Sequence, residues 1–248
     1  MKYFLASWKM YPTVEEARAL FEAVQAGLRE RAVSGRALPD VIVCPPFVSL
    51  VPLRAEADDR VLRLGAQNCH WEQEGPYTGE ISPRMLVGLV DYVMLGHSER
   101  RAMGETDDQI ARKVAAVVAA GLVPLLFVGE DDRGHDAIRL TEQRLRHGLS
   151  RVDVRQQDVV VVYEPTWAVG AQQAAPPDHI EGAVQHLKGV LTDLGARSPE
   201  VIYGGTVNDA NVDDLARLDV LDGLGATRAS LRPETFFAIV DRVGTAVG

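Results

Sequence analysis

The sequence predicts an α/β protein that folds as one closed (β/α)₈ barrel, a single domain over residues 1–248. Short apolar or β-branched runs alternate with longer amphipathic runs, giving eight strand-then-helix units of about 31 residues each, the size of a βα repeat. The run Val159–Val162 is apolar throughout, as expected for a parallel strand covered on both faces. No Pro- or Ser-rich linker divides the chain, because Ala174–Pro177 has the composition of a turn before a helix. An open doubly wound sheet is the structural alternative, but it usually has fewer units.

The apolar runs predict the strands in chain order. The expected strands are Tyr3–Trp8, Val41–Cys44, Val61–Ala66, Tyr92–Leu95, Val123–Val128, Val159–Tyr163, Val201–Tyr203 and Gly223–Ala226.

Helices are expected between these strands. The first starts at Thr13–Glu16, which has the spacing of a capping box, and covers Val14–Arg29. Ser82 followed by Pro83 places a cap before a proline at the first helical position. The remaining expected helices are Val48–Ala57, which is the weakest pattern, Asp107–Ala120, Ala137–Leu149, Asp178–Leu194, Asp209–Leu218 and Pro233–Val243.

Composition and charge narrow the possible functions. The chain is 46% apolar and 25% charged, which is ordinary for a globular protein with a sizeable core. A net charge of −9 without a long basic run argues against a general nucleic-acid or membrane-surface binder, although a locally positive site can still bind a phosphate. The apolar stretches are too short to span a bilayer, and Met1 leads directly into a strand pattern without a signal segment. We therefore expect a cytoplasmic protein.

The cysteines, Cys44 and Cys69, have neither the spacing of a metal site nor the number of a disulfide scaffold. We expect both to be reduced thiols in or near the core, and we expect no metal site.

Three polar residues follow three of the expected strands. Lys9, His97 and Glu164 each lie just past the end of an apolar run. In a parallel barrel the ends of the strands meet at one rim, so these side chains are expected to converge. An ammonium, an imidazole and a carboxylate together suit proton transfer beside a carbonyl group.

Longer motifs identify a family. The chain resembles the triosephosphate isomerase family over essentially its whole length, in the family's order and at near-family spacing. The motifs that carry the resemblance are Ser7–Met10, Gly65–Asn68, Gly75–Glu80, Leu95–Arg101, Tyr163–Gly170 and Tyr203–Val207.

The resemblance implies a TIM barrel and an aldose–ketose isomerase of a small phosphorylated sugar, a role in glycolysis, and no cofactor or metal. It makes Glu164 the base that removes a proton beside the carbonyl, and His97 a neutral group that polarises the carbonyl and shuttles protons. It makes Lys9 the cation that stabilises developing negative charge, with Glu99 as its partner.

The resemblance also implies a mobile lid and a dimer. The lid is expected over Pro165–Ala175, with Ala168–Gly170 at its tip, and its closure excludes water from the reaction. Thr78 is expected to reach toward a partner subunit of a two-fold homodimer.

The expected phosphate-binding end departs from the family pattern. Ser7 replaces the family's asparagine, Thr206 replaces a serine, and the lid reads Gly170-Ala171 where the family has Gly-Thr. Thr227 and Arg228 stand at the positions of a Gly-Gly pair whose amides hold the phosphate in the family. The residues expected to bind substrate or phosphate are therefore Ser7, Gly170, Ala171, Thr206, Thr227 and Arg228.

These departures leave alternatives open. The Arg228 guanidinium can bind the phosphate in place of amides, or the pocket can be shaped for a four-carbon ketose phosphate. A non-catalytic sugar-phosphate-binding barrel is a further alternative, against which the three occupied catalytic positions argue. An aldolase would need a Schiff-base lysine within the barrel, and Lys9 is the sole candidate near the site.

Overall fold

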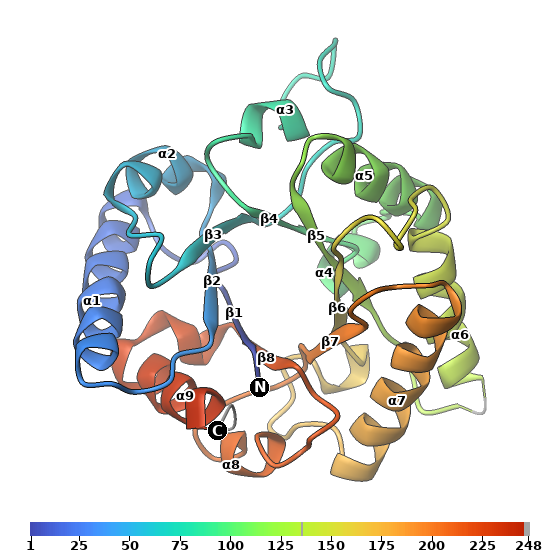
Figure 1. Ribbon diagram of the computed structural model, residues 1–248. Helices are drawn as coiled ribbons and strands as arrows, with labels where there is room; N and C mark the ends of the chain where they lie inside the picture. The colour runs from blue at the N-terminus through green and yellow to red at the C-terminus, as the bar shows by residue number, and fades with distance from the viewer. Residues whose placement is uncertain (135, 246–248) are drawn as a thin grey trace.

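The computed structural model describes residues 1–134 and 136–245, and it confirms the predicted closed barrel. Eight parallel strands pair in chain order, and β8 pairs with β1 to close the ring (Figure 1). Helices surround the ring on the outside, as the alternating pattern requires. The strands are β1 Tyr3–Ser7, β2 Asp40–Cys44, β3 Arg63–Ala66, β4 Tyr92–Leu95, β5 Val123–Val128, β6 Val160–Tyr163, β7 Glu200–Tyr203 and β8 Gly223–Ala226.

The expected strands are all present, with small shifts at some ends. The largest shift is at β3, which starts at Arg63 rather than Val61. The N–H groups of Val61 and Leu62 both donate to the carbonyl of Asp58, so these two residues belong to a turn and do not join the sheet.

The α-helices of the described residues include every segment that the sequence predicts. They are α1 Val14–Val33, α2 Phe47–Glu56, α3 Pro83–Leu86, α4 Ser98–Ala102, α5 Asp107–Ala119, α6 Ala137–Gly148, α7 Pro177–Asp193, α8 Val212–Leu215 and α9 Pro233–Thr245. Two 3₁₀-helices, η1 Thr166–Ala168 and η2 Arg228–Leu231, follow β6 and β8. The short elements α4, η1 and η2 were not predicted.

The predicted helix starts at Thr13 and Ser82 are confirmed. Thr13 and Glu16 form the reciprocal capping box, and the Ser82 side chain accepts the N–H of Met85. The prediction for Asp209–Leu218 was wrong in length, because α8 covers only Val212–Leu215. The side chains of Asn208 and Asn211 accept nearby backbone N–H groups, which fixes a turn where the first helical residues were expected.

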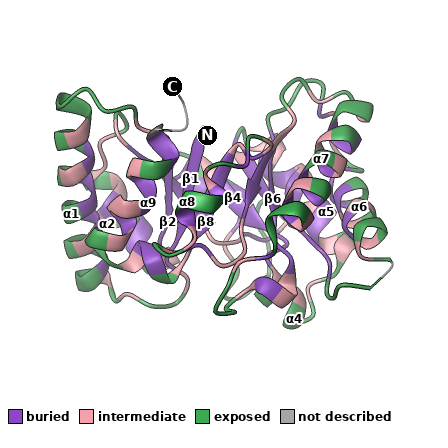
Figure 2. Cartoon of the chain, turned by 90° about the horizontal axis from the view of Figure 1, so that it is seen from below, coloured by how far each residue is buried: buried purple, intermediate pink, exposed green. Residues whose placement is uncertain are grey.

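Alternate strand residues fill the barrel interior, while their neighbours pack outward against the helices. The strands at the centre of the ring are mostly buried (Figure 2). Leu5, Met94 and Phe127 belong to the interior set and also form the floor of the cavity described below. β8 lies very close to β1, because a Cβ at Gly223 would collide with the carbonyl of Tyr3. The packed interior therefore supports the site from beneath.

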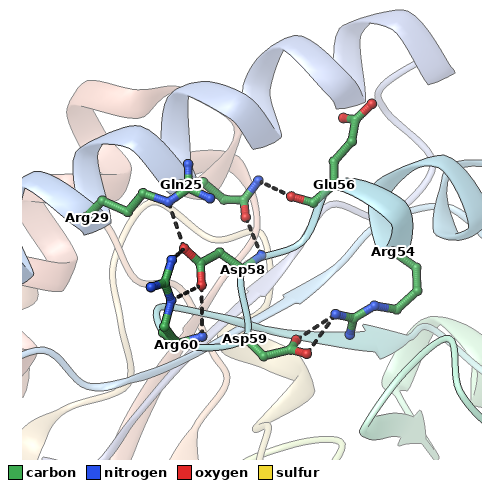
Figure 3. A network of polar contacts seen from close by, with 7 residues as sticks. All are labelled: Gln25, Arg29, Arg54, Glu56, Asp58, Asp59 and Arg60. Atoms are coloured by element: carbon green, nitrogen blue, oxygen red, sulfur yellow. Dashed lines mark hydrogen bonds and ion pairs between the residues drawn. The ribbon is translucent and has the colours of Figure 1, made fainter.

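A polar network holds the segment between α2 and β3 against α1 (Figure 3). The buried Gln25 amide donates to the carbonyl of Glu56 over 3.2 Å and accepts the N–H of Asp58 over 2.6 Å. The Asp58 carboxylate accepts from Arg60 and Arg29, each over 2.8 Å. Hydrogen bonds from Arg60 and then Arg29 hold the pKa of Asp58 well below its usual value.

The two cysteines are buried free thiols, as predicted. Burial raises the pKa of Cys69 to about 12 and raises that of Cys44 further. Within residues 1–134 and 136–245, no helix combines the length and apolar character needed to cross a membrane.

Candidate active site

The three polar residues that follow β1, β4 and β6 line one cavity of about 510 Å³. Lys9 and His97 each lie two residues beyond their strands, and Glu164 directly follows β6. The cavity opens at the end of the barrel where the strands finish, the lower rim in Figure 2, where α4 lies. The predicted convergence of these side chains is therefore present in the structure.

Lys9 has a strained backbone. Its φ of 47° is in the left-handed region, where a side chain is unfavourable. Trp8, fully buried beside it, anchors the chain, and the Gln67 amide donates to the carbonyl of Lys9 over 2.8 Å. The sequence placed Trp8 in the strand, but β1 ends at Ser7 because the chain turns here. The turn directs the Lys9 ammonium to Glu99, whose Oε1 is 2.7 Å from Nζ.

His97 is held by the first turn of α4. It is the N-cap residue of that helix, and its Nδ1 accepts the backbone N–H of Glu99 over 3.1 Å. An Nδ1 that accepts a hydrogen bond carries no proton, so the neutral ring carries its proton on Nε2. Burial and then the charge of Lys9 lower the pKa of His97 to about 4, against an opposing effect of Glu99. His97 is therefore neutral at physiological pH.

Glu164 is a buried carboxyl group with 3% of its surface exposed. Its Oε2 accepts the N–H of Ser98 over 2.8 Å, and its Oε1 lies 3.1 Å from Nε2 of His97. Burial raises the pKa of Glu164 to about 7, although the hydrogen bonds from Ser98 act in the opposite direction. Phe127 packs against the His97 ring, with centroids 5.0 Å apart, and helps to keep water away from the pair.

Glu99 lies closer to solvent than the other three, with 54% of its side chain exposed. Burial would raise the pKa of Glu99, but the hydrogen bond and the charge of Lys9 outweigh it and lower the pKa. Glu99 is therefore an ionised partner of Lys9, in the position expected from the sequence.

The six residues expected to bind substrate or phosphate also line this cavity. Ser7 extends the inward-facing series of Tyr3 and Leu5 on β1, and its buried hydroxyl has no hydrogen-bond partner among the described residues. Thr227 is partly exposed, and Arg228 is exposed at the start of η2. Gly170, Ala171 and Thr206 line it as well, and Gly170 lies next to the Arg228 guanidinium.

The segment Pro165–Ala175, the expected lid, is hydrogen-bonded to the end of β7 and to the loop that follows it. The Thr206 hydroxyl donates to the carbonyls of Ala168 and Ala171, over 2.8 and 3.1 Å. The Tyr203 hydroxyl accepts the N–H of Ala175 over 2.9 Å. In this arrangement the proton of Thr206 bonds to the lid rather than pointing into the cavity, so Thr206 acts here as a lid contact.

Sequence reasoning missed Glu130, which joins the base of the lid to the barrel. This carboxylate is 1% exposed and accepts from Tyr163 over 2.8 Å and from Nε1 of Trp167 over 3.1 Å. Nε2 of His179 lies 2.7 Å from the same Oε1 atom. Glu130 follows β5 by two residues, as Lys9 and His97 follow their strands, so the same positional rule could have found it.

Thr78 is exposed, in the loop between β3 and α3 that projects beyond the ring of helices (Figure 1). His70 at the base of this loop stacks on Trp71 and also contacts the ring of Tyr77, with centroids 4.1 and 4.3 Å away. In the part of the chain that the structure describes, no group of three or more His, Cys, Asp or Glu side chains is arranged to hold a metal ion.

Comparison with known proteins gives the family directly. Residues 2–243 match the family model for triosephosphate isomerase. The chain belongs to the triosephosphate isomerase family. A triosephosphate isomerase of Carboxydothermus hydrogenoformans is 39% identical over 250 residues, covering 96% of this chain and 98% of the relative. One from Herpetosiphon aurantiacus is 41% identical over 244 residues, covering 94% and 96%, and one from Dehalococcoides mccartyi is 36% identical over 241 residues, covering 94% and 92%.

Membership of the triosephosphate isomerase family confirms the resemblance seen in the sequence. The chain is an enzyme, a sugar-phosphate isomerase of the triosephosphate isomerase type.

Proposed function

We propose that this enzyme interconverts dihydroxyacetone phosphate and D-glyceraldehyde 3-phosphate through an enediolate. The observation that carries the proposal is the arrangement of a buried carboxyl group, a neutral imidazole and an ammonium around one cavity. The names of the relatives support the three-carbon substrate.

Glu164 begins the reaction as the base. Its carboxylate takes a proton from the carbon beside the carbonyl, a C=C bond forms, and the carbonyl electrons move to oxygen. The proton then returns from Glu164 to the neighbouring carbon, so no proton is lost overall. A pKa of about 7 suits this exchange, because Glu164 can both accept and release a proton near neutral pH.

His97 supplies the second proton path. Its Nε2–H donates to the substrate carbonyl oxygen and transfers protons between the two oxygens of the enediolate. Without substrate this N–H faces Glu164 at 3.1 Å, so the carbonyl oxygen replaces Glu164 as the acceptor when substrate binds. The Lys9 ammonium stabilises the negative charge on the enediolate, and Glu99 holds Lys9 in place.

The lid, together with residues at the ends of β1, β7 and β8, is proposed to hold the phosphate. Gly170 and Ala171 of the lid, Ser7 and Thr206, and Thr227 and Arg228 after β8 surround this end. Closure of the lid over the phosphate keeps water from the enediolate, which would otherwise eliminate phosphate.

A four-carbon ketose phosphate is the second candidate substrate. Thr227 and Arg228 place side chains in the cavity wall, where they can alter the fit for chain length. Both candidates need the same proton transfers, so they differ in selectivity rather than in mechanism.

We also propose a homodimer in which Thr78 reaches toward the partner subunit. Several apolar side chains are exposed, with Met10 94%, Met103 76%, Met85 59% and Tyr77 41% exposed. Their burial between two copies would remove this apolar surface from water. Sedimentation of the wild type and of a Met85→Arg variant tests the dimer, since a monomeric wild type would exclude it.

The remaining proposals concern the compartment, the pathway, the cofactor and the partners of the enzyme. We propose that the enzyme acts in the cytoplasm, in glycolysis, without a cofactor, and that it binds neither nucleic acid nor membranes. The net charge of −9 supports the last point.

A panel of three- and four-carbon sugar phosphates tests the proposed reaction. We expect the highest kcat/KM for D-glyceraldehyde 3-phosphate. A higher value for a tetrulose phosphate would assign the four-carbon substrate, and no isomerisation of any member would refute the proposed reaction.

A further inference from the structure

The charged side chains that line the cavity do not all have an ion-pair or hydrogen-bond partner. Among the lining residues that the structure describes, the carboxyl groups are Glu99 and Glu164, and the cationic side chains are Lys9 and Arg228. Lys9 is paired with Glu99 at 2.7 Å. Arg228 has no hydrogen-bonding or ion-pair partner among the described residues, so its guanidinium is available to a ligand.

A dianionic substrate would meet strong repulsion without this cation. When Glu164 is ionised, the charges of these four side chains sum to zero, and without Arg228 the cavity would be negative before a phosphate entered. The overall charge of −9 adds no general attraction for an anion. Phosphate binding therefore needs a local cation, and Lys9 is already occupied by Glu99.

The position of Arg228 suits the phosphate end of a substrate. Arg228 follows β8, which lies across the barrel from β4, the strand that leads to His97 (Figure 1). One guanidinium nitrogen of Arg228 lies 3.8 Å from the point that a Cβ on Gly170 would occupy. The guanidinium is therefore next to the tip of the lid.

A second polar group on the same side lacks a partner. In the β1–β8 register the last pair is Ala6 with Ala226, so Ser7 and Thr227 are the next residue on each side. Ser7 is 6% exposed and lines the cavity, and its buried hydroxyl has no hydrogen bond in the described structure. A buried hydroxyl is normally satisfied, so this one indicates a polar ligand at the seam between β1 and β8.

We propose that Arg228 is the phosphate-recognising side chain of this enzyme, binding the phosphate beneath the lid tip while Ser7 donates to the same ligand. Only the identity of the ligand as a sugar phosphate rests on the proposed function. A guanidinium can give two parallel hydrogen bonds to phosphate oxygens, so it fixes orientation as well as supplying charge. Because the guanidinium lies beside Gly170, a phosphate bound to Arg228 would also contact the lid tip, so binding at this end favours a closed lid.

Two independent readouts test the role of Arg228. Calorimetry with inorganic phosphate measures the subsite alone, and steady-state kinetics compare D-glyceraldehyde 3-phosphate with D-glyceraldehyde, which has the same reacting carbons but no phosphate. Two variants are compared. Arg228→Met keeps most of the length of the side chain but removes its charge, and Arg228→Lys keeps the charge but removes the guanidinium that can donate two parallel hydrogen bonds. Arg232→Met is the matched control, because Arg232 is exposed four residues further on and does not line the cavity.

We expect Arg228→Met to weaken phosphate binding and to lower kcat/KM for the phosphorylated substrate by roughly 10- to 100-fold, chiefly through KM. Activity on D-glyceraldehyde should fall by a much smaller factor than activity on the phosphorylated substrate. Arg228→Lys should recover part of the loss, and Ser7→Ala should weaken phosphate binding less than Arg228→Met does. Arg232→Met should match the wild type in both assays.

The outcomes separate this inference from the proposed reaction. Wild-type phosphate affinity in Arg228→Met, an equal loss on both substrates, or no phosphate binding by the wild type would overturn the role of Arg228. If the wild type isomerises neither sugar but Arg228→Met still weakens phosphate binding, the proposed reaction is wrong and the role of Arg228 in phosphate binding is retained.

Discussion

The backbone N–H of Glu99 donates to Nδ1 of His97, so the loop that carries the imidazole also fixes its tautomer. A protonated His97 would need Nδ1 to be a donor, directly facing another N–H. The start of α4 therefore holds His97 neutral with its remaining proton on Nε2, toward the cavity.

The first prediction concerns the pH dependence of catalysis. Glu164 acts as a carboxylate, so kcat/KM should rise with pH through a midpoint near the pKa of about 7 and level off above it. His97 titrates near 4 and should add no break between pH 5 and 9. Initial rates across this range test the prediction. A rate that is already level from about pH 5.5 upward, as the ordinary Glu pKa of 4.5 would give, would show that burial does not control Glu164.

The second prediction concerns stability. Because the pKa of Glu164 is higher in the folded state than its ordinary 4.5, the folded protein binds more protons between these values and loses stability as pH rises through about 7. Glu164→Gln removes this loss and should raise the free energy of unfolding by roughly 1–3 kcal/mol at pH 8. Urea unfolding at pH 8 and pH 4 measures the difference, which should shrink toward the lower pH.

The third prediction concerns the ammonium of Lys9. Lys9→Met removes the cation that stabilises the enediolate, so kcat should fall on the order of 10²–10³-fold. Steady-state assays with circular dichroism as a folding control provide the measurement. Retention of a near-normal rate in a folded variant would end the assignment of Lys9.

The fourth prediction separates the strain at Lys9 from its charge. Both Lys9→Gly and Lys9→Ala lose the ion pair with Glu99, but only glycine adopts a φ near 47° without a Cβ penalty. We expect the Gly variant to be more stable than the Ala variant by about 1 kcal/mol. Equal thermal stability of the two would mean that the turn relaxes when the lysine is removed.

The fifth prediction concerns the lid. Thr206→Val keeps the shape of the side chain but removes the hydrogen bonds to Ala168 and Ala171. The lid arrangement that these bonds hold should then be less populated, and kcat/KM should fall about 10-fold. Thr206→Ser keeps the hydroxyl and serves as the control. If the Val variant matches the Ser variant, the hydroxyl does not stabilise the lid.

The sequence predicted the barrel and its eight strands because each βα unit carries its own pattern of apolar residues. It failed where backbone geometry depends on a single residue or on distant contacts. Trp8 is as apolar as the strand before it, but the left-handed backbone of Lys9 ends β1 one residue earlier. The helix α4 has five residues, too few for a hydrophobic period to appear.

The sequence predicted those site residues that lie just past the ends of strands. Lys9, His97, Glu99 and Glu164 meet as expected, but the pKa shifts of the pair depend on burial that no local pattern reveals. Glu130 contacts side chains at positions 163, 167 and 179, and this joining of separated segments is visible only in the folded chain.

The pairing of β1 with β8 has a consequence for biosynthesis. β1, which leads to Lys9, is synthesised before the other seven strands, while β8, which completes the ring, is synthesised after them. Until then the hydrogen-bonding edge of β1 is unprotected and open to intermolecular pairing. A nascent chain that stops before residue 223 should therefore be both inactive and prone to aggregate, however well its earlier units have formed.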